Sequence, residues 1–128
     1  QAADHPKTPD ASLFGGFIER RNRFVSNWTD RISDAAGRGG VAIWGAGAKG
    51  VTFSLLTDPA RESIDCLIDI NPGKQGNYVP LTGHAIVSPE QAAARGIRTV
   101  IVANPIYADE VAGACRLLGM DVGIIPLS

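Results

Sequence analysis

The sequence predicts an α/β fold, in which a five-stranded parallel sheet carries helices on both faces. The first observation is a short apolar run, 41–44, which ends at glycines in the spacing G-x-G-x-x-G, namely Gly45, Gly47 and Gly50. An apolar stretch that can form a helix follows this turn. The second observation is the alternation of strand-like and helix-like patterns along the rest of the chain, which is typical of parallel sheets.

The N-terminal part of the chain predicts a tail and one long helix. Residues 1–10 contain two prolines and small polar residues, so we expect a disordered tail. Apolar residues then recur at steps of three and four, which predicts a helix over about 12–36. Its arginines, 20, 21 and 23, are expected on a solvated face, with a phosphate or protein contact as the alternative. With 128 residues in all, residues 11–128 are predicted to form a single domain.

The remaining elements follow from short apolar runs and their flanking turn residues. Strands are predicted at 41–44, 64–70, 85–87, 99–103 and 121–126, and helices at about 48–57, 89–95 and 107–118. Alternation of this kind predicts a Rossmann-like three-layer sandwich with the strand order 3-2-1-4-5. A ligand crevice is then expected at the carboxyl ends of strands one and four, where the glycine turn, the loop 69–84 and the loop 103–107 should meet.

The loop over residues 71–84 departs from a standard nucleotide-binding fold. Its prolines and glycines exclude the regular helix that usually joins the second and third strands. Long segments without regular structure are uncommon inside compact domains, and they are often functional. We therefore expect this loop to contribute to the function of the protein.

Composition excludes several classes of function. A net charge of -1 gives no general attraction to nucleic acid or to an anionic membrane, and no apolar run is long enough to span a bilayer. Cys66 and Cys115 are interpreted as buried thiols in a reducing cytoplasm, and no Cys/His cluster predicts a metal. Since the chain lacks an initiator Met, we interpret it as a processed or excised piece.

The loop and the glycine turn together resemble a known family. Residues 69–86 read DINPGKQGNYVPLTGHAI and resemble the D-x-N-P-x-K-Q-G-x-x-x-P-x-T-G-H-x-I segment in the C-terminal domain of sugar C-methyltransferases. The turn WGAGAKG at 44–50 is similar to the glycine turn of that family, and Ser88-Pro89-Glu90 follows in its usual place. The resemblance extends from Phe14 to the C-terminus.

This resemblance implies a role within a larger enzyme. Members of the family use S-adenosylmethionine (SAM) to methylate a carbon of a nucleotide-linked deoxysugar. They have a zinc-binding N-terminal domain, a central methyltransferase domain and this Rossmann-like C-terminal domain. The resemblance implies that SAM and the catalytic base belong to the central domain, upstream of this chain. The chain itself would hold no cofactor, would not methylate alone, and would complete the nucleotide-sugar site while packing on the catalytic domain.

The glycine turn and the strand that follows it supply the first candidate ligand contacts. Gly45, Gly47 and Gly50 are predicted to form a turn that accepts an anion, although they could serve only as a tight turn. Lys49 could reach a phosphate, or it could be an exposed lysine. Asp69, which lies 22 residues after Gly47, could accept ribose hydroxyls, or it could cap an Asx-type turn that needs no ligand.

The loop supplies the remaining candidates. Asn71, Lys74 and Gln75 are candidate nucleotide or sugar contacts, and Lys74 and Gln75 could equally contact an adjoining domain. His84 could donate to a ligand and respond to pH, although a lone loop histidine is more often hydrogen-bonded to the backbone. We find no nucleophile elbow and no paired carboxylates, so no catalytic residue is predicted.

Two other functions remain open from the sequence. The chain could be an NAD-dependent oxidoreductase domain, which the glycine turn and Asp69 favour, or a stand-alone module that binds a nucleotide or a nucleotide-sugar. The loop string is the feature that distinguishes the first interpretation, because an NAD domain does not need it. If the domain lacks a neighbour, we also expect an exposed apolar patch around Phe14, Phe17 and Trp28, with possible self-association through it.

Overall fold

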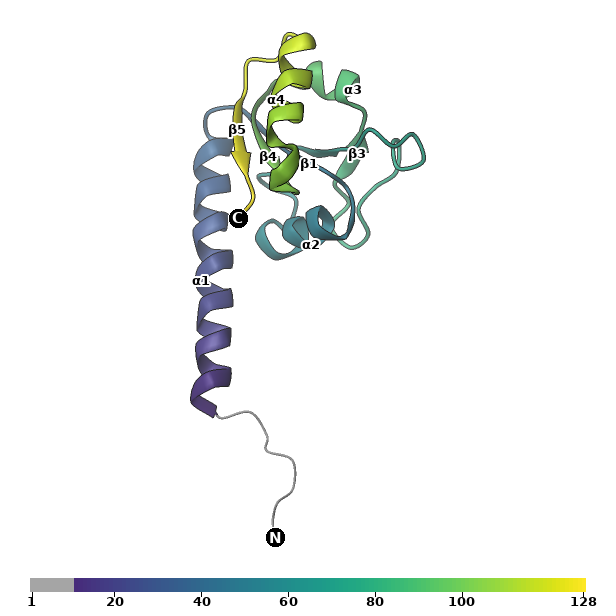
Figure 1. Ribbon diagram of the computed structural model, residues 1–128. Coiled ribbons are helices and arrows are strands. Elements are labelled where there is room, and N and C mark those ends of the chain that lie inside the picture. The colour runs from purple at the N-terminus through teal and green to yellow at the C-terminus, as the bar shows by residue number, and fades with distance from the viewer. Residues whose placement is uncertain (1–10) are drawn as a thin grey trace.

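A computed structural model describes residues 11–128, with side chains from Gly15 onward (Figure 1). The tail expected over residues 1–10 and the side chain of Phe14 lie outside this part. The helices are α1 (Ala11–Ala36), α2 (Ala48–Thr57), α3 (Pro89–Ala93) and α4 (Ala108–Leu117), with one 3-10 turn, η1 (Pro105–Tyr107). The strands are β1 (Gly40–Trp44), β2 (Cys66–Ile68), β3 (Ala85–Val87), β4 (Ile97–Val102) and β5 (Gly123–Pro126).

The five strands form one parallel sheet in the order β3-β2-β1-β4-β5, which confirms the predicted topology. Strand residues alternate between two apolar clusters, one on each face of the sheet. Val41 and Ile43 of β1 join the cluster beneath α1 and α2, whereas Ala42 joins the cluster that α4 covers. The molecule therefore has three layers, with helices on both faces of the sheet (Figure 1).

Some predicted boundaries differ from the observed ones. Strand β2 covers 66–68 rather than 64–70, because the amide of Ile64 donates to the Asp58 carboxylate and Ile70 lies 72% exposed beyond the last strand pair. The helix predicted from Tyr107 begins as a 3-10 turn, in which the side chain of Asn104 accepts a hydrogen bond from the amide of Ile106. The predicted cap of α3 is confirmed, since the Ser88 hydroxyl accepts from the amide of Gln91 in a capping box.

Helix α1 is much longer than the sheet that it covers. Its 26 residues span about 39 Å, whereas the five residues of β1 span about 17 Å. Only residues 37–39 join the two elements, so α1 runs antiparallel to β1 and its N-terminal half extends beyond the carboxyl ends of the strands (Figure 1). Trp28 and Ile32 anchor the other half, and Trp28 lies edge-on against the ring of Phe53 with 5.2 Å between centroids.

The exposed apolar patch on α1 includes Phe17 but not Trp28, contrary to the expectation from the sequence. Trp28 was expected at the surface, and this was wrong, because its ring is 4% exposed and fills the contact between α1 and α2. Phe17 is 59% exposed and lies on the projecting half of α1. The apolar stripe of α1 is therefore buried in the core at Trp28 and exposed to solvent at Phe17.

The loop between β2 and β3 has a defined conformation. A turn over residues 71–77 is followed by an antiparallel bridge between Tyr78 and Ala85. The amide of Ile86 donates to the carbonyl of Asn77, and the amide of Val79 donates to that of His84. The loop thus folds back on the start of β3, and several of its backbone groups are paired without a helix.

Candidate functional site

A cleft lies at the carboxyl ends of β1 and β4, where the strand order reverses direction. Its volume is about 620 Å³. Its walls are the glycine turn, the end of β2, the end of β4 and one face of α4. It is lined by Trp44, Gly45, Gly47, Ala48, Lys49, Gly50, Asp69, Ile70, Val102, Ala103, Asn104, Tyr107, Glu110, Val111 and Ala114. This is the position at which open α/β sheets bind their ligands.

The three glycines of the turn have different structural roles. Gly45 has a φ of 118°, a conformation that favours glycine. A Cβ on Gly50 would lie 1.9 Å from the carbonyl oxygen of Gly45, so this position holds α2 close against the turn. A Cβ on Gly47, by contrast, would meet no atom within 4 Å. Gly47 thus leaves open space at the cleft, and only the other two glycines are required by the fold.

The N-terminal end of α2 faces this cleft. Gly47 is the residue that precedes the helix, and no side chain in residues 15–128 caps it. The backbone N–H groups of a first helical turn, together with the helix dipole, favour an anion at such an end. Lys49, in this first turn, also lines the cleft and adds a positive charge. An anionic group of a ligand would therefore be stabilised at this end of the cleft.

Asp69 connects the glycine turn to the loop. Its Oδ2 accepts a hydrogen bond of 2.9 Å from the amide of Ala46, and its Oδ1 accepts one of 2.8 Å from the amide of Asn71. The second bond is the Asx-type turn that the sequence offered as an alternative to ligand binding. Asp69 nevertheless lines the cleft, and each carboxylate oxygen can accept more than one hydrogen bond. Both roles are thus compatible with the observed geometry.

Three other predicted residues support the turn from outside the cleft lining. The Nζ of Lys74 donates to the carbonyl of Ala46 at 3.2 Å, and the Nε2 of Gln75 donates to that of Asp69 at 2.8 Å. The Oδ1 of Asn71 accepts from the amide of Gly73 at 2.9 Å. Lys74 thus fixes the loop against the glycine turn, whereas Gln75 and Asn71 hold the backbone of the loop and of the residue that precedes it.

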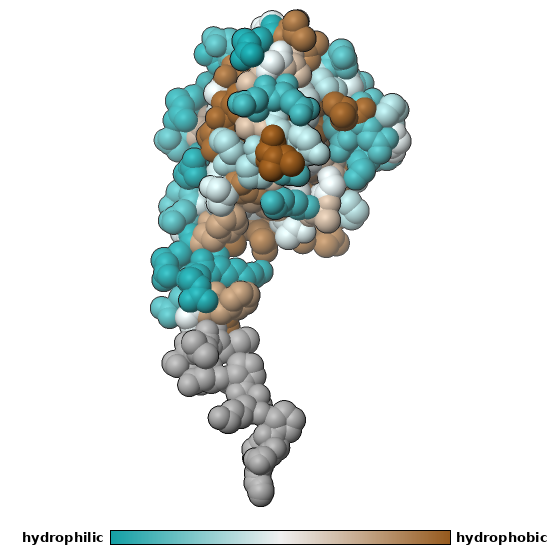
Figure 2. All heavy atoms as spheres, in the orientation of Figure 1, coloured by the Kyte–Doolittle hydropathy of each residue, from teal (hydrophilic) through white to brown (hydrophobic). Residues whose placement is uncertain are grey.

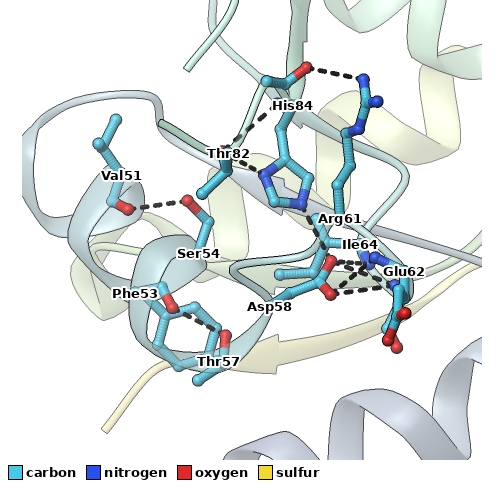
Figure 3. Close-up of polar contacts among 12 residues, drawn as sticks. Val51, Phe53, Ser54, Thr57, Asp58, Arg61, Glu62, Ile64, Thr82 and His84 are labelled. Atoms are coloured by element: carbon cyan, nitrogen blue, oxygen red, sulfur yellow. Dashed lines mark hydrogen bonds and ion pairs between the residues drawn. The ribbon is translucent and has the colours of Figure 1, made fainter. Parts of the chain in front are cut away.

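His84 lies in a buried polar network rather than in the cleft (Figure 3). Its Nε2 is 3.0 Å from the Oδ2 of Asp58, and its Nδ1 is 2.7 Å from the Oγ1 of Thr82. Because the carboxylate only accepts, we assign the proton of a neutral ring to Nε2, and the Thr82 hydroxyl then donates to Nδ1. The histidine thereby joins the loop before β3 to the connection between α2 and β2.

Asp58 is the centre of that network. Besides His84, its carboxylate accepts from the amides of Glu62, Ser63 and Ile64. Burial acts to raise the pKa of Asp58, but the hydrogen bonds from His84 and these amides outweigh it and hold the pKa below its ordinary value. The network therefore contains a stably ionised carboxylate and holds the loop that supports the cleft.

Sequence reasoning did not select several residues of the cleft. Asn104 and Tyr107 follow β4, and Glu110 lies in the first turn of α4. The expectation that the loop 103–107 reaches the crevice is the signal that could have identified the first two. Glu110 carries no such signal, because only the packing of α4 beside β4 brings it to the cleft.

The cleft presents charged and hydrogen-bonding side chains to a ligand. Within residues 15–128, no three His, Cys, Asp or Glu side chains converge to form a metal site. The thiols lie elsewhere, buried in the sheet and in α4. In the described part of the molecule, moreover, no helix has the length and apolarity that a bilayer span requires. The arrangement can orient a ligand through hydrogen bonds and charge, which is a binding role.

We expect Cys66 to be unreactive in the folded protein. Burial and the neighbouring Asp65 carboxylate raise the pKa of the Cys66 thiol to about 12, so almost no thiolate exists at neutral pH. Iodoacetamide at pH 8 should leave Cys66 unmodified in the native state and modify it in denaturant, as mass spectrometry of the peptides can show. Rapid alkylation of the native protein would contradict this expectation.

The fold and the cleft define the chain as a Rossmann-like α/β domain with a binding cleft at the strand-order reversal. The sequence pattern of a family described as C-methyltransferase C-terminal domain matches residues 4–121, so the chain belongs to that family. This match confirms the resemblance drawn from the loop and the glycine turn.

A solved structure supports the fold. The crystal structure of RSP, a Rex-family repressor, is similar with a TM-score of 0.52 and 19% sequence identity. The match covers 69% of this chain and 52% of that one, so the likeness spans about half the length of the repressor. No curated protein shows significant similarity to the chain.

Proposed function

We propose that this chain completes the substrate site of a SAM-dependent sugar C-methyltransferase, by binding the nucleotide part of a nucleotide-linked deoxysugar in its cleft. The catalytic domain beside it would bind SAM and transfer the methyl group, in the cytoplasm. The observation that carries the proposal is the convergence of the α2 N-terminus, Lys49 and Asp69 in one cleft of about 620 Å³. Membership of a C-methyltransferase family supplies the reaction class.

The chemistry of a nucleotide matches the groups in the cleft. A phosphate would lie at the N-terminal end of α2 with Lys49 nearby, since both favour negative charge. Ribose hydroxyls would donate to the free lone pairs of Asp69. Ile70 and Tyr107 supply apolar and aromatic surface, on which a base can pack. Because the proposal assigns methyl transfer to the catalytic domain, the reacting carbon would lie beside that domain.

Gly47→Val is expected to weaken nucleotide-sugar binding at least tenfold, which corresponds to about 1.4 kcal/mol. The added side chain would occupy the open space at Gly47, where a Cβ has no neighbour within 4 Å. The cost in stability should stay near 1 kcal/mol, because valine is a poorer residue than glycine before a helix. Calorimetric titration with a thymidine-diphosphate sugar measures the affinity.

The matched control is Gly123→Val on β5, where the Cβ would also meet nothing within 4 Å and the position lies outside the cleft. This variant should bind as the wild type does. Parallel titrations with NADH and SAM distinguish the alternatives. Heat with NADH and none with the nucleotide-sugar would reject the proposal in favour of an oxidoreductase domain, and equal affinity of Gly47→Val and wild type would place the ligand outside this cleft.

A further inference from the structure

The projecting half of α1 has an apolar face without a partner in the domain. We define the projecting segment as residues 15–25. In it, Phe17 is 59% exposed, Ile18 39% and Phe24 38%. Figure 2 shows hydrophobic and hydrophilic surface side by side where the helix leaves the body. These exposures are high for residues on the apolar side of an amphipathic helix.

The same face is buried where the helix meets the body. Trp28 follows Phe24 by one helical turn, and Ile32 follows Trp28 by another; both are buried in the core. The ring of Phe24 lies 6.5 Å from that of Phe53, which is the outermost aromatic contact between α1 and α2. The exposed stripe thus continues the surface by which α1 packs on the rest of the domain, and it lies on the same side of the helix.

The charges of the projecting segment indicate what could cover it. Arg21 follows Phe17 by four residues and precedes Phe24 by three, so it lies within the apolar stripe. Arg20 and Arg23 flank it, and three arginines against one Glu19 give the segment a net charge of +2. No ion pair joins these arginines to another residue whose side chain the structure describes. A complementary surface would be apolar and would carry carboxylates.

A second copy of the chain fits these charges poorly. If two projecting segments paired face to face, each segment of charge +2 would meet another of the same sign, with an Arg21 in each apolar stripe. Like charges at a partly desolvated contact oppose association, whereas carboxylates opposite Arg21 would favour it. The charge pattern therefore favours a different partner with an acidic contact surface.

The cleft opens at the same edge of the molecule. Strands β2 and β4 end at this edge, and beyond them Ile70 is 72% and Ile106 77% exposed. Helix α1 passes this edge and projects beyond it, so the helix and this edge of the sheet form an angle (Figure 1). A partner seated in this angle would contact both α1 and the rim of the cleft.

We propose that the projecting segment of α1 is the docking surface for the methyltransferase catalytic domain, which presents to it an apolar face with a carboxylate opposite Arg21. This inference rests on the proposed function, and it specifies the surface through which this chain would bind the catalytic domain. Docking at this angle brings the catalytic domain to the mouth of the cleft, so that a sugar attached to a bound nucleotide would extend toward it. Ligand sites are common at such domain interfaces.

The test is the binding of this chain to the catalytic domain of a family methyltransferase, supplied without its own C-terminal domain. Phe17→Ser and Arg21→Glu should each weaken the affinity at least tenfold in calorimetry. Leu117→Ser and Arg116→Glu on α4 are the matched controls, with Leu117 91% exposed, and should stay within about twofold. Thermal unfolding of Phe17→Ser and Arg21→Glu should match the wild type, since neither side chain is buried.

The possible outcomes separate this inference from the proposed function. Binding that neither α1 variant changes would overturn it, and so would the absence of binding to the catalytic domain. Sedimentation that shows a dimer lost in Phe17→Ser would instead make a second copy the occupant. Docking that requires Phe17 and Arg21, in a chain that binds no nucleotide-sugar, would support the docking surface and reject the proposed ligand of the cleft.

Discussion

Replacing Gly50 by alanine is expected to lower the free energy of unfolding by about 3–5 kcal/mol, a large part of the stability of an ordinary domain. The new Cβ would lie 1.9 Å from the carbonyl oxygen of Gly45 and 3.1 Å from its carbonyl carbon. These are backbone atoms, so no side-chain rotation relieves the clash. To make room, the turn would have to move away from α2, although the amide of Gly45 is held at 2.7 Å by the carbonyl of Ile68.

Urea unfolding followed by circular dichroism measures this loss, and Gly47→Ala is the control within the same turn. Gly47 has a φ of -78°, and a Cβ there would meet no atom within 4 Å. Its replacement by alanine should therefore cost at most about 1 kcal/mol. Equal losses for the two variants would show that flexibility of the turn, rather than the close approach at Gly50, explains the glycine pattern.

The contrast between these glycines shows why the sequence predicts the turn well. The spacing of Gly45, Gly47 and Gly50 between an apolar strand and a helix depends on neighbouring residues only, so the requirement is visible in a short window of sequence. The strand order follows from the same local logic, because alternating strands and helices allow few topologies. The five-stranded parallel sheet in the predicted order confirms that reasoning.

The roles of the loop residues could not be predicted in the same way. Lys74 reaches the carbonyl of Ala46 across 28 positions in the sequence, and His84 reaches Asp58 across 26. From the sequence, Asp58 is only the residue that follows the helix predicted at about 48–57. The three amides that its carboxylate accepts from lie four to six positions away, but nothing local indicates the imidazole of His84, which lies 26 positions away.

Removal of the Asp58 carboxylate is expected to destabilise the protein by about 3–5 kcal/mol at neutral pH, since each buried donor left without an acceptor costs about 1–3 kcal/mol. Asp58→Ala would leave the amides of Ser63 and Ile64 and the ring of His84 without their acceptor in a buried site. Of these groups, His84 is fully buried, so water cannot replace the carboxylate without a rearrangement of the loop. Chemical unfolding at pH 7 gives the size of the loss.

The pH dependence of this loss tests its cause. Because the pKa of Asp58 is lower in the folded state than its ordinary value of 3.8, its contribution to stability is complete above that value and disappears as the pH falls through the folded pKa. The difference between wild type and Asp58→Ala should thus be constant near neutrality and shrink in acid. Asp65→Asn is the control, since Asp65 pairs with Arg95 at a half-exposed position and should cost less than about 1 kcal/mol. If both variants lost the same stability, or if the Asp58→Ala difference persisted unchanged in acid, the ionised carboxylate would not be what holds the loop.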